Sequence, residues 1–231
     1  MTYSKYMMQS NLIDGEWIAA DNGGTLNVVN PATGEAIGTV PACTSKETAR
    51  AIEAARRAFP TFSTMPLLER VGLLWKLHDA LLDNQKSLAE LLTLEQGKPI
   101  AEATGEIVIG AAYIRWFAEE IRRTKGEIVP AAAPDRRILV TKHPIGVVGM
   151  ITPWNFPSSM LARKIGPALA AGCTIVAKPA SATPYSGLAW GALCEEVGFP
   201  KGVVNILTGP AGEIGSTIMS SPVVRKVTFT G

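Results

Sequence analysis

The sequence has few residues that bind metals or form disulfides, with two histidines and three cysteines among 231 residues. Cys43, Cys173 and Cys194 are odd in number and none belongs to a CxxC pair, which excludes a disulfide scaffold and a cysteine-based zinc site. His78 and His143 lie far apart in the sequence, so a histidine-rich metal site is not expected either. We therefore predict a protein without a metal, in a reducing compartment.

Long hydrophobic runs and runs of like charge are also missing. The 22 basic and 20 acidic residues give a net charge of +2, and no five like charges follow one another, which excludes a nucleic-acid arm and a membrane-surface patch. Every apolar stretch is interrupted well before the roughly 18 residues of a membrane span. The amino-terminal segment contains no apolar h-region of a signal peptide. We predict a soluble cytoplasmic protein with no nucleic-acid or membrane partner.

What the sequence does contain is ample apolar content, at 47%, arranged in two patterns. In the first part, an Asp-Gly turn within residues 12–18 predicts a hairpin in a small amino-terminal β region. Thr44 and Glu47 match a helix capping box, and apolar residues at helical spacing predict further helices from about Leu67 and about Glu102. Two extended runs between residues 126 and 144 predict a β-hairpin that protrudes from the domain body.

From residue 146 the pattern becomes an alternation of buried strands and helices. This order predicts a doubly wound, mostly parallel, Rossmann-like α/β sheet. Ligands bind such sheets at the carboxyl ends of the strands, which directs the search for a site to the loops that follow them. The expected strands are residues 146–152, 173–178, 203–207 and 226–229, and the expected helices are about 158–170, 184–197 and 213–220.

The loop after the first of these strands offers one candidate residue. Asn155 lies between Pro153 and Pro157, which restrict the loop, and directly before a predicted helix. There its side-chain amide can donate to an oxygen that gains negative charge, which is the chemistry of an oxyanion hole. The alternative is that Asn155 only caps the helix.

The next two strands are followed by groups that suit a nucleotide. Lys178 and Ser181 place an ammonium and a hydroxyl where a ribose or phosphate binds in such sheets, and the alternative is a solvated lysine at a strand end. Gly209, Gly212 and Gly215 lead into a helix without forming GxGxxG. They are therefore either a weak phosphate-cradle signal or a simple turn and helix cap.

Several segments carry a resemblance in their order and spacing along the whole chain: 152–157 (TPWNFP), 160–164 (MLARK), 166–174 (GPALAAGCT), 178–181 (KPAS), 204–209 (VNILTG) and 227–231 (VTFTG). Together they resemble the NAD(P)-dependent aldehyde dehydrogenase superfamily. Within it, the sequence is most similar to succinate-semialdehyde dehydrogenases. This second resemblance rests on residues 30–35 (NPATGE), 94–99 (LEQGKP), 113–120 (YIRWFAEE) and the Arg163-Lys164 pair.

The resemblance implies a role for each matching residue. Asn155 would stabilise the oxyanion of the tetrahedral intermediate, and Lys178 would contact the adenosine ribose or its phosphate. Ser181 stands where many NAD-preferring relatives have a glutamate, which would repel a 2′-phosphate, so we expect NADP rather than NAD as the cofactor. Arg163 would bind a distal carboxylate of the substrate, the alternative being a charged residue on a solvated helix face. The other implied cofactor-binding residues are Ile151, Thr152, Pro153, Trp154, Ala180, Gly209, Gly215 and Gly231.

The resemblance also implies a part that the matching segments do not supply. The family uses a cysteine nucleophile and a glutamate that activates water, and both belong to the half of the pattern that would follow Gly231. None of the three cysteines stands in a matching context, although Cys43, just before a helix cap, is expected to be the most accessible. We therefore expect a truncated, amino-terminal half that is inactive alone and lacks the catalytic domain. Residues 1–125 and 145–231 would form an incomplete cofactor-binding domain, and residues 126–144 an oligomerisation hairpin of a homo-oligomeric full-length enzyme.

The predicted activity is oxidation of succinate semialdehyde to succinate with NAD(P)+. Within the same class, glutarate semialdehyde or another ω-carboxyl aldehyde is the alternative substrate. An alternative of another class is a non-catalytic module that binds a cofactor or another subunit.

Overall fold

A six-stranded sheet forms the centre of the protein in a computed structural model, which describes residues 2–231. The strands lie in the order β10-β7-β8-β9-β1-β2. Neighbours among the first four are parallel, which confirms the predicted doubly wound, mostly parallel sheet. Their bounds are β7 Val147–Ile151, β8 Thr174–Lys178, β9 Val204–Ile206 and β10 Val224–Phe229.

The predicted amino-terminal hairpin is confirmed but belongs to the main sheet rather than to a separate region. Asp14 and Gly15 adopt φ angles of 56° and 73°, the left-handed conformation that a two-residue hairpin turn needs. They join β1 (Asn11–Ile13) to β2 (Glu16–Ile18). Strand β1 pairs with β9 antiparallel, so the hairpin extends the parallel sheet on its β9 side.

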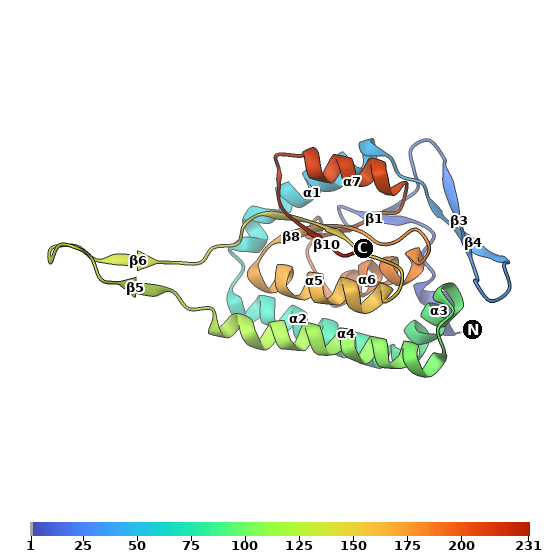
Figure 1. Ribbon diagram of the computed structural model, residues 1–231, viewed down its shortest axis with the longest axis horizontal. Helices are drawn as coiled ribbons and strands as arrows, with labels where there is room; N and C mark the ends of the chain where they lie inside the picture. Colours follow the sequence, from blue (N-terminus) through green and yellow to red (C-terminus); the bar gives the residue numbers. More distant parts are fainter. Residues whose placement is uncertain (1) are drawn as a thin grey trace.

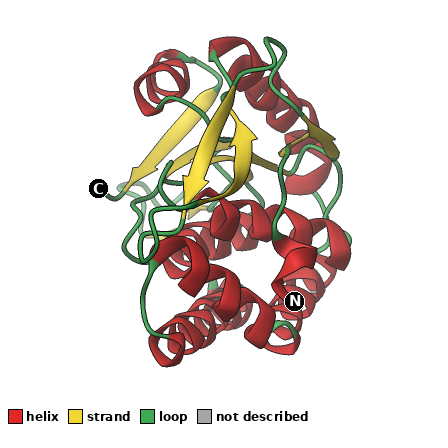
Figure 2. Cartoon of the chain, turned by 90° about the vertical axis from the view of Figure 1, so that its right-hand side faces the viewer, coloured by secondary structure: helices red, strands yellow, loops and turns green. Residues whose placement is uncertain are grey.

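Helices cover both faces of this sheet (Figures 1 and 2). Because side chains of a strand alternate between faces, Val148 and Met150 of β7 join the larger core while Val147 joins a second, smaller core on the other face. The larger core lies against α5 (Pro157–Ala171) and α6 (Pro184–Val197), and the smaller one against α1 (Ser45–Ser63) and α7 (Ala211–Ser220).

A further helical layer packs outside α5 and α6. It consists of α2 (Leu67–Asp83), α3 (Gln85–Gln96) and α4 (Ile100–Glu120). Helices α2 and α4 were predicted from the sequence but α3 was not, because only Asn84 separates it from α2 and no Gly or Pro marks the break. Acidic side chains of α3 and α4 reach the N-terminal ends of α6 and α5.

Two hairpins stand apart from the layers. One joins β3 (Thr25–Val29) and β4 (Ala36–Pro41), and the other joins β5 (Glu127–Val129) and β6 (Ile138–Val140). Figure 1 shows β5 and β6 extending far from the body, and all of their residues are exposed. Short 3₁₀ turns occupy Thr2–Tyr6 and Ile121–Arg123. Within residues 2–231, the helices are all too short or too polar to cross a bilayer.

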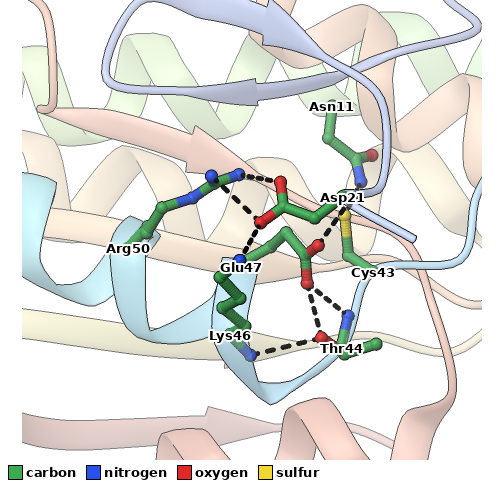
Figure 3. Close-up of polar contacts among 7 residues, drawn as sticks. All are labelled: Asn11, Asp21, Cys43, Thr44, Lys46, Glu47 and Arg50. Carbon is green, nitrogen blue, oxygen red and sulfur yellow. Dashed lines mark hydrogen bonds and ion pairs between the residues drawn. The ribbon is translucent and has the colours of Figure 1, made fainter. Parts of the chain in front are cut away.

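The start of α1 is fixed by a polar cluster, drawn in Figure 3. Thr44 is the N-cap and Glu47 completes the capping box, as the sequence predicted. The Glu47 carboxylate accepts bonds from the Thr44 amide, the Thr44 hydroxyl and the Asp21 amide at 2.6–2.8 Å. Burial opposes ionisation of Glu47, but these donors lower its pKa to about 2. Lys46 and Arg50 in turn hold the Asp21 side chain by ion pairs.

The same cluster corrects the expectation for Cys43. This thiol was expected to be the most accessible, but it is fully buried. Asn11 donates to its sulfur at 2.9 Å, and the Cys43 amide donates to the Thr208 carbonyl. Thr208 lies two residues after β9, and its hydroxyl donates to Asn11 Oδ1. The cluster therefore ties the start of α1 to the carboxyl end of β9, next to Gly209.

Candidate functional site

The strand order reverses between β7 and β10, at the edge of the sheet where open α/β proteins have their binding crevice. From β7 the chain moves outward through β8 and β9, then crosses back to place β10 on the other side of β7. In open α/β sheets, ligands bind where the strand order reverses in this way, outside the carboxyl ends of the strands. Residues 152–156, the loop from β7 to α5, start at this point. A buried hydroxyl there, Thr152 Oγ1, has no hydrogen-bond partner within residues 2–231.

Asn155 lies in this loop with its amide free to donate. Phe156, not Asn155, occupies the N-cap position of α5, so the structure overturns the alternative that Asn155 is a helix cap. Asn155 Oδ1 accepts the Phe156 amide at 3.1 Å, which leaves the Nδ2 group of this exposed residue without a hydrogen bond within residues 2–231. This arrangement can stabilise an oxyanion placed at the loop.

The α5 N-terminus itself is capped by α4. Pro157, the first residue of α5, has no N–H, and the next two backbone N–H groups, of Ser158 and Ser159, donate to Glu106 Oε1 at 2.9 and 3.0 Å. Glu106 also forms a buried ion pair with Lys98, at 2.6 Å. Neither residue was predicted from the sequence, because no spacing rule connects positions 98 and 106 with the loop near 155.

The α6 N-terminus is capped in a parallel way by α3. Glu95 is buried and accepts the amides of Tyr185 at 2.9 Å and Ser186 at 2.5 Å. As a result, the helix N-termini that follow β7 and β8 already carry a carboxylate. A phosphate bound beside α5 or α6 must therefore find its donors elsewhere, because these N–H groups are already bound.

Burial of Glu95 gives a testable pH dependence. Burial raises the pKa of Glu95 to about 7, against the hydrogen bonds from Ser186 and Tyr185. Between pH 4.5 and about 7 the folded protein holds a proton on Glu95 that the unfolded chain releases at its ordinary pKa of 4.5. The free energy of unfolding therefore falls as the pH rises from about 4.5 to 7. In urea melts, the unfolding free energy should fall by up to about 1.4 kcal/mol per pH unit in this window, and Glu95→Gln should remove that slope.

Glu47 provides the matched control for this prediction. Its pKa is lowered, so the stability it contributes is full above pH 4.5 and is lost as the pH falls towards about 2. Glu47→Gln should therefore change the slope only below pH 4.5. Equal slopes between pH 5 and 7 in the unaltered chain and in Glu95→Gln would contradict the assignment to Glu95.

The β8 end presents a buried lysine beside a hydroxyl. Lys178 is 3% exposed, and its Nζ donates to Ser181 Oγ at 3.1 Å and to the Pro179 carbonyl at 3.0 Å. Burial lowers its pKa, and no carboxylate within residues 2–231 forms an ion pair with it. The alternative of a solvated lysine is therefore wrong. An ammonium with only neutral partners gains from an anion, so this corner fits a ribose phosphate.

Gly209 completes this corner from β9. Ser181 Oγ donates to its carbonyl at 3.4 Å, which joins the β8 and β9 ends. Gly209 has a φ of 153°, and a Cβ there would collide with the carbonyl oxygen of Cys43. Only glycine therefore allows the backbone to pass so close to the α1 cluster.

The remaining residues implied for the cofactor lie around the same crevice. Thr152 bonds through its amide to the Lys178 carbonyl, and the Thr230 amide bonds to Ile151, which brings the chain near Gly231 to the end of β7. Gly215 lies inside α7, where a Cβ would be 3.7 Å from Ile151. Ile151, Pro153 and Ala180 are half-buried, while Trp154 and Gly231 are exposed.

Arg163 lies on the exposed side of α5. Its guanidinium donates to the Tyr113 hydroxyl at 2.9 Å and stacks 5.1 Å from that ring. It also lines a cavity of about 310 Å³ together with Lys164, Lys226 and Cys173. Three cationic side chains at one cavity suit an anionic group.

Lys164 is a buried residue for which the sequence predicts no role. Its Nζ donates to the hydroxyls of Thr228 and Thr230 at 3.0 and 2.7 Å, and burial lowers its pKa. The bonds connect α5 with β10 across the crevice. Its only signal in the sequence was its position directly after Arg163.

The cysteine thiols are poorly placed for nucleophilic chemistry. Burial raises the pKa of Cys43 to about 11 and also raises that of Cys194, so both stay protonated at neutral pH. Cys173 is 3% exposed. Within residues 2–231, no group of three or more His, Cys, Asp or Glu side chains is arranged to hold a metal ion.

The chain is similar to known proteins along nearly its whole length. The model of the aldehyde dehydrogenase family matches residues 17–231. A glutarate-semialdehyde dehydrogenase of Pseudomonas aeruginosa is 54% identical over 99% of this chain and 47% of the relative. An Escherichia coli succinate-semialdehyde dehydrogenase, named for NADP+, is 50% identical over 99% of this chain and 47% of the relative.

A solved structure agrees with these matches. The crystal structure of an E. coli NADP-dependent enzyme superposes with a TM-score of 0.98 at 50% identity, covering 99% of this chain and 47% of that one. This chain thus spans about half the length of the relatives it matches.

Proposed function

The chain belongs to the aldehyde dehydrogenase family, as its motifs predicted, and we propose that it supplies the NADP-binding and oxyanion-stabilising half of a semialdehyde dehydrogenase. Family membership makes the chain part of an oxidoreductase. The proposed reaction is oxidation of succinate semialdehyde to succinate. Glutarate semialdehyde is the second candidate, because a relative named for that substrate is 54% identical.

This proposal is carried by two features that lie at the same edge of the sheet, where the strand order reverses. Within residues 2–231, Asn155 presents an amide donor without an acceptor, and Lys178 with Ser181 presents a cation and a hydroxyl without a carboxylate partner. An oxidoreductase that uses a dinucleotide needs both a place for charge that develops on the substrate and a place for the cofactor.

The cofactor fits the residues present, and its nicotinamide when bound accepts a hydride from the substrate carbon. Lys178 and Ser181 would hold the adenosine 2′-phosphate, which is why NADP is favoured over NAD. The backbone of residues 151–154 and the glycines at 209 and 215 would line the rest of the cofactor. Asn155 would donate to the aldehyde oxygen as it becomes an oxyanion.

For the substrate, we propose that Arg163 pairs with the distal carboxylate. Its place in a cavity with Lys164 and Lys226 supports an anionic group there. Nη2 of the guanidinium donates to Tyr113 and Nη1 donates weakly to the Met160 sulfur at 3.7 Å, which leaves further N–H groups for a carboxylate.

Arg163→Ala should raise KM for succinate semialdehyde roughly tenfold or more, because a hydrogen bond to a charged group contributes about 1.5 to 3 kcal/mol. The assay needs a chimeric enzyme, in which residues 1–231 are followed by the carboxyl-terminal part of the P. aeruginosa relative. Butanal, which lacks the carboxylate, is the control and should be nearly unaffected. Equal losses on both aldehydes would show that Arg163 is structural.

Residues 126–144 would contact another subunit of a homo-oligomer, with residues 1–125 and 145–231 forming the cofactor-binding domain. The apolar side chains of the hairpin support this proposal. Ile128 is 78% exposed and Leu139 is 68% exposed, with no part of the body covering them. A two-stranded ribbon without a packed face is marginal in water, so a covering partner suits it.

Two proteins test the proposed function. The chimeric enzyme should reduce NADP+ with succinate or glutarate semialdehyde, and a folded chimera that reduces no cofactor with either aldehyde would refute the proposal. Residues 1–231 alone should show no turnover, because their three thiols are buried and two of them have raised pKa values. Turnover by the short chain above that of its Asn155→Ala variant would contradict this and point first to Cys173.

A further inference from the structure

We propose that Lys98 and Glu106 are positioning residues that fix the main chain at Asn155. This inference rests on the proposed role of Asn155 as the oxyanion donor. The carrying observation is a buried ion pair, remote in sequence from the loop, that binds one backbone atom of the loop, the Asn155 carbonyl oxygen, and two backbone N–H groups of the first turn of α5.

Lys98 holds the loop from its carbonyl side. Its Nζ lies between two acceptors, Glu106 Oε2 at 2.6 Å and the Asn155 carbonyl oxygen at 3.0 Å, and lies 4.0 Å from the centre of the Phe156 ring. The Lys98 side chain is 8% exposed, so these partners replace water for its charge. The ammonium therefore binds the backbone of Asn155 and stacks on the next residue.

Glu106 holds the loop from its amide side. One oxygen pairs with Lys98, and the other accepts the amides of Ser158 and Ser159. The side chain is 1% exposed. Because the α5 N-terminus and the Asn155 carbonyl are bound to the same ion pair, residues 155 to 159 are held as one unit against α4.

Helix capping alone does not account for the lysine. The α6 N-terminus is capped by Glu95 through the same two N–H bonds, and no cation pairs with that carboxylate within residues 2–231. A buried ion pair also costs desolvation that a lone cap or an apolar pair avoids. What Lys98 adds at α5 is the bond to Asn155, so the pair is specialised for this loop.

The consequence concerns the direction of the Asn155 amide. With its carbonyl held by Lys98 and its Oδ1 held by the Phe156 amide, the residue has few ways to rotate Nδ2 away. An oxyanion donor must be in place before charge develops, because reorientation during the reaction would cost the stabilisation. The opposite charges of Lys98 and Glu106 provide this rigidity without adding net charge to the loop.

The test uses residues 1–231 and a double variant, Lys98→Met with Glu106→Gln. The glutamine side chain at position 106 can still accept from the Ser158 and Ser159 amides, and no buried charge is left unpaired, so the variant removes mainly the bond to Asn155. We expect hydrogen exchange of the Phe156 amide, which donates to Asn155 Oδ1, to become at least tenfold faster. The Asn155 side-chain amide signals in NMR should broaden or average. The separate variant Lys98→Arg, which retains a cationic donor beside Glu106, should keep most of the exchange protection of the unaltered chain.

Glu95→Gln is the matched control, since it alters a buried cap that does not touch the loop. Unchanged exchange and unchanged Asn155 signals in the double variant would overturn the proposal. Equal loosening of the loop in Glu95→Gln would also overturn it, because the effect would then be one of global stability.

A measurement on the unaltered chain keeps the proposal testable if the variants do not fold. The Lys98 ammonium should give a slowly exchanging NMR signal with a coupling across the hydrogen bond to the Asn155 carbonyl carbon. Absence of both would refute the proposal. Failure of the proposed function would appear elsewhere, as a folded chimera without NADP+ reduction, and would leave these measurements unaffected.

Discussion

Replacing Asn155 with alanine in the chimeric enzyme is expected to lower kcat by about 100- to 1000-fold, the effect typical of losing one oxyanion donor. Asn155 is exposed and its Oδ1 is bound to the Phe156 amide, so its Nδ2 group is a donor ready for the developing charge. KM should change little, because the aldehyde oxygen carries a full negative charge only after attack. Steady-state kinetics with succinate semialdehyde measure both constants.

The control for Asn155→Ala is cofactor affinity. Lys178 and Ser181 lie at the end of another strand, so NADP+ binding measured by calorimetry should stay within about twofold of the unaltered chimera. A loss of kcat smaller than about threefold would show that Asn155 is not the donor. A parallel loss of cofactor affinity would show that the alanine disturbs the loop as a whole.

Replacing Lys178 with methionine is expected to weaken NADP+ binding by roughly 10- to 150-fold, since a hydrogen bond to a charged group is worth about 1.5 to 3 kcal/mol. Methionine matches the length of the buried stem and removes only the cation, whose other partners are neutral. NAD+ lacks the 2′-phosphate and should lose less. Titration of the chimera with each cofactor gives the ratio.

Ser181→Glu is the companion variant at the same corner. A carboxylate facing the 2′-phosphate should shift preference from NADP towards NAD by at least about tenfold, or 1.4 kcal/mol. A preference for NADP that is unchanged in both variants would place the phosphate elsewhere on the protein.

The sequence predicted the parts of the site that depend on strand order. Strands of buried character alternating with helices placed Asn155, Lys178 and Gly209 at one edge of the sheet before any contact was known, and the structure has them at the ends of β7, β8 and β9. Such predictions succeed because period and turn chemistry are local properties of the chain.

The parts that failed depend on contacts between distant segments. Glu106 meets Ser158 across 52 positions and Glu95 meets Tyr185 across 90, and neither pairing leaves a mark in local spacing. Cys43 looked accessible beside its helix cap, but Asn11 and Thr208 arrive from opposite ends of the chain to bury it. Burial of a polar group is decided by such long-range packing, which one sequence read locally does not contain.

The hairpin of β5 and β6 is also a place where the chain could be cut and reconnected. It leaves the body after the 3₁₀ turn Ile121–Arg123 and returns just before β7, and residues 122–130 are exposed throughout. Cutting the tip between residues 131 and 135 would break no core contact, because the segments on both sides are held by α4 and by the sheet. The molecule therefore offers a site where new chain termini, a reporter domain or a circular permutation could be introduced while the crevice at β7 keeps its shape.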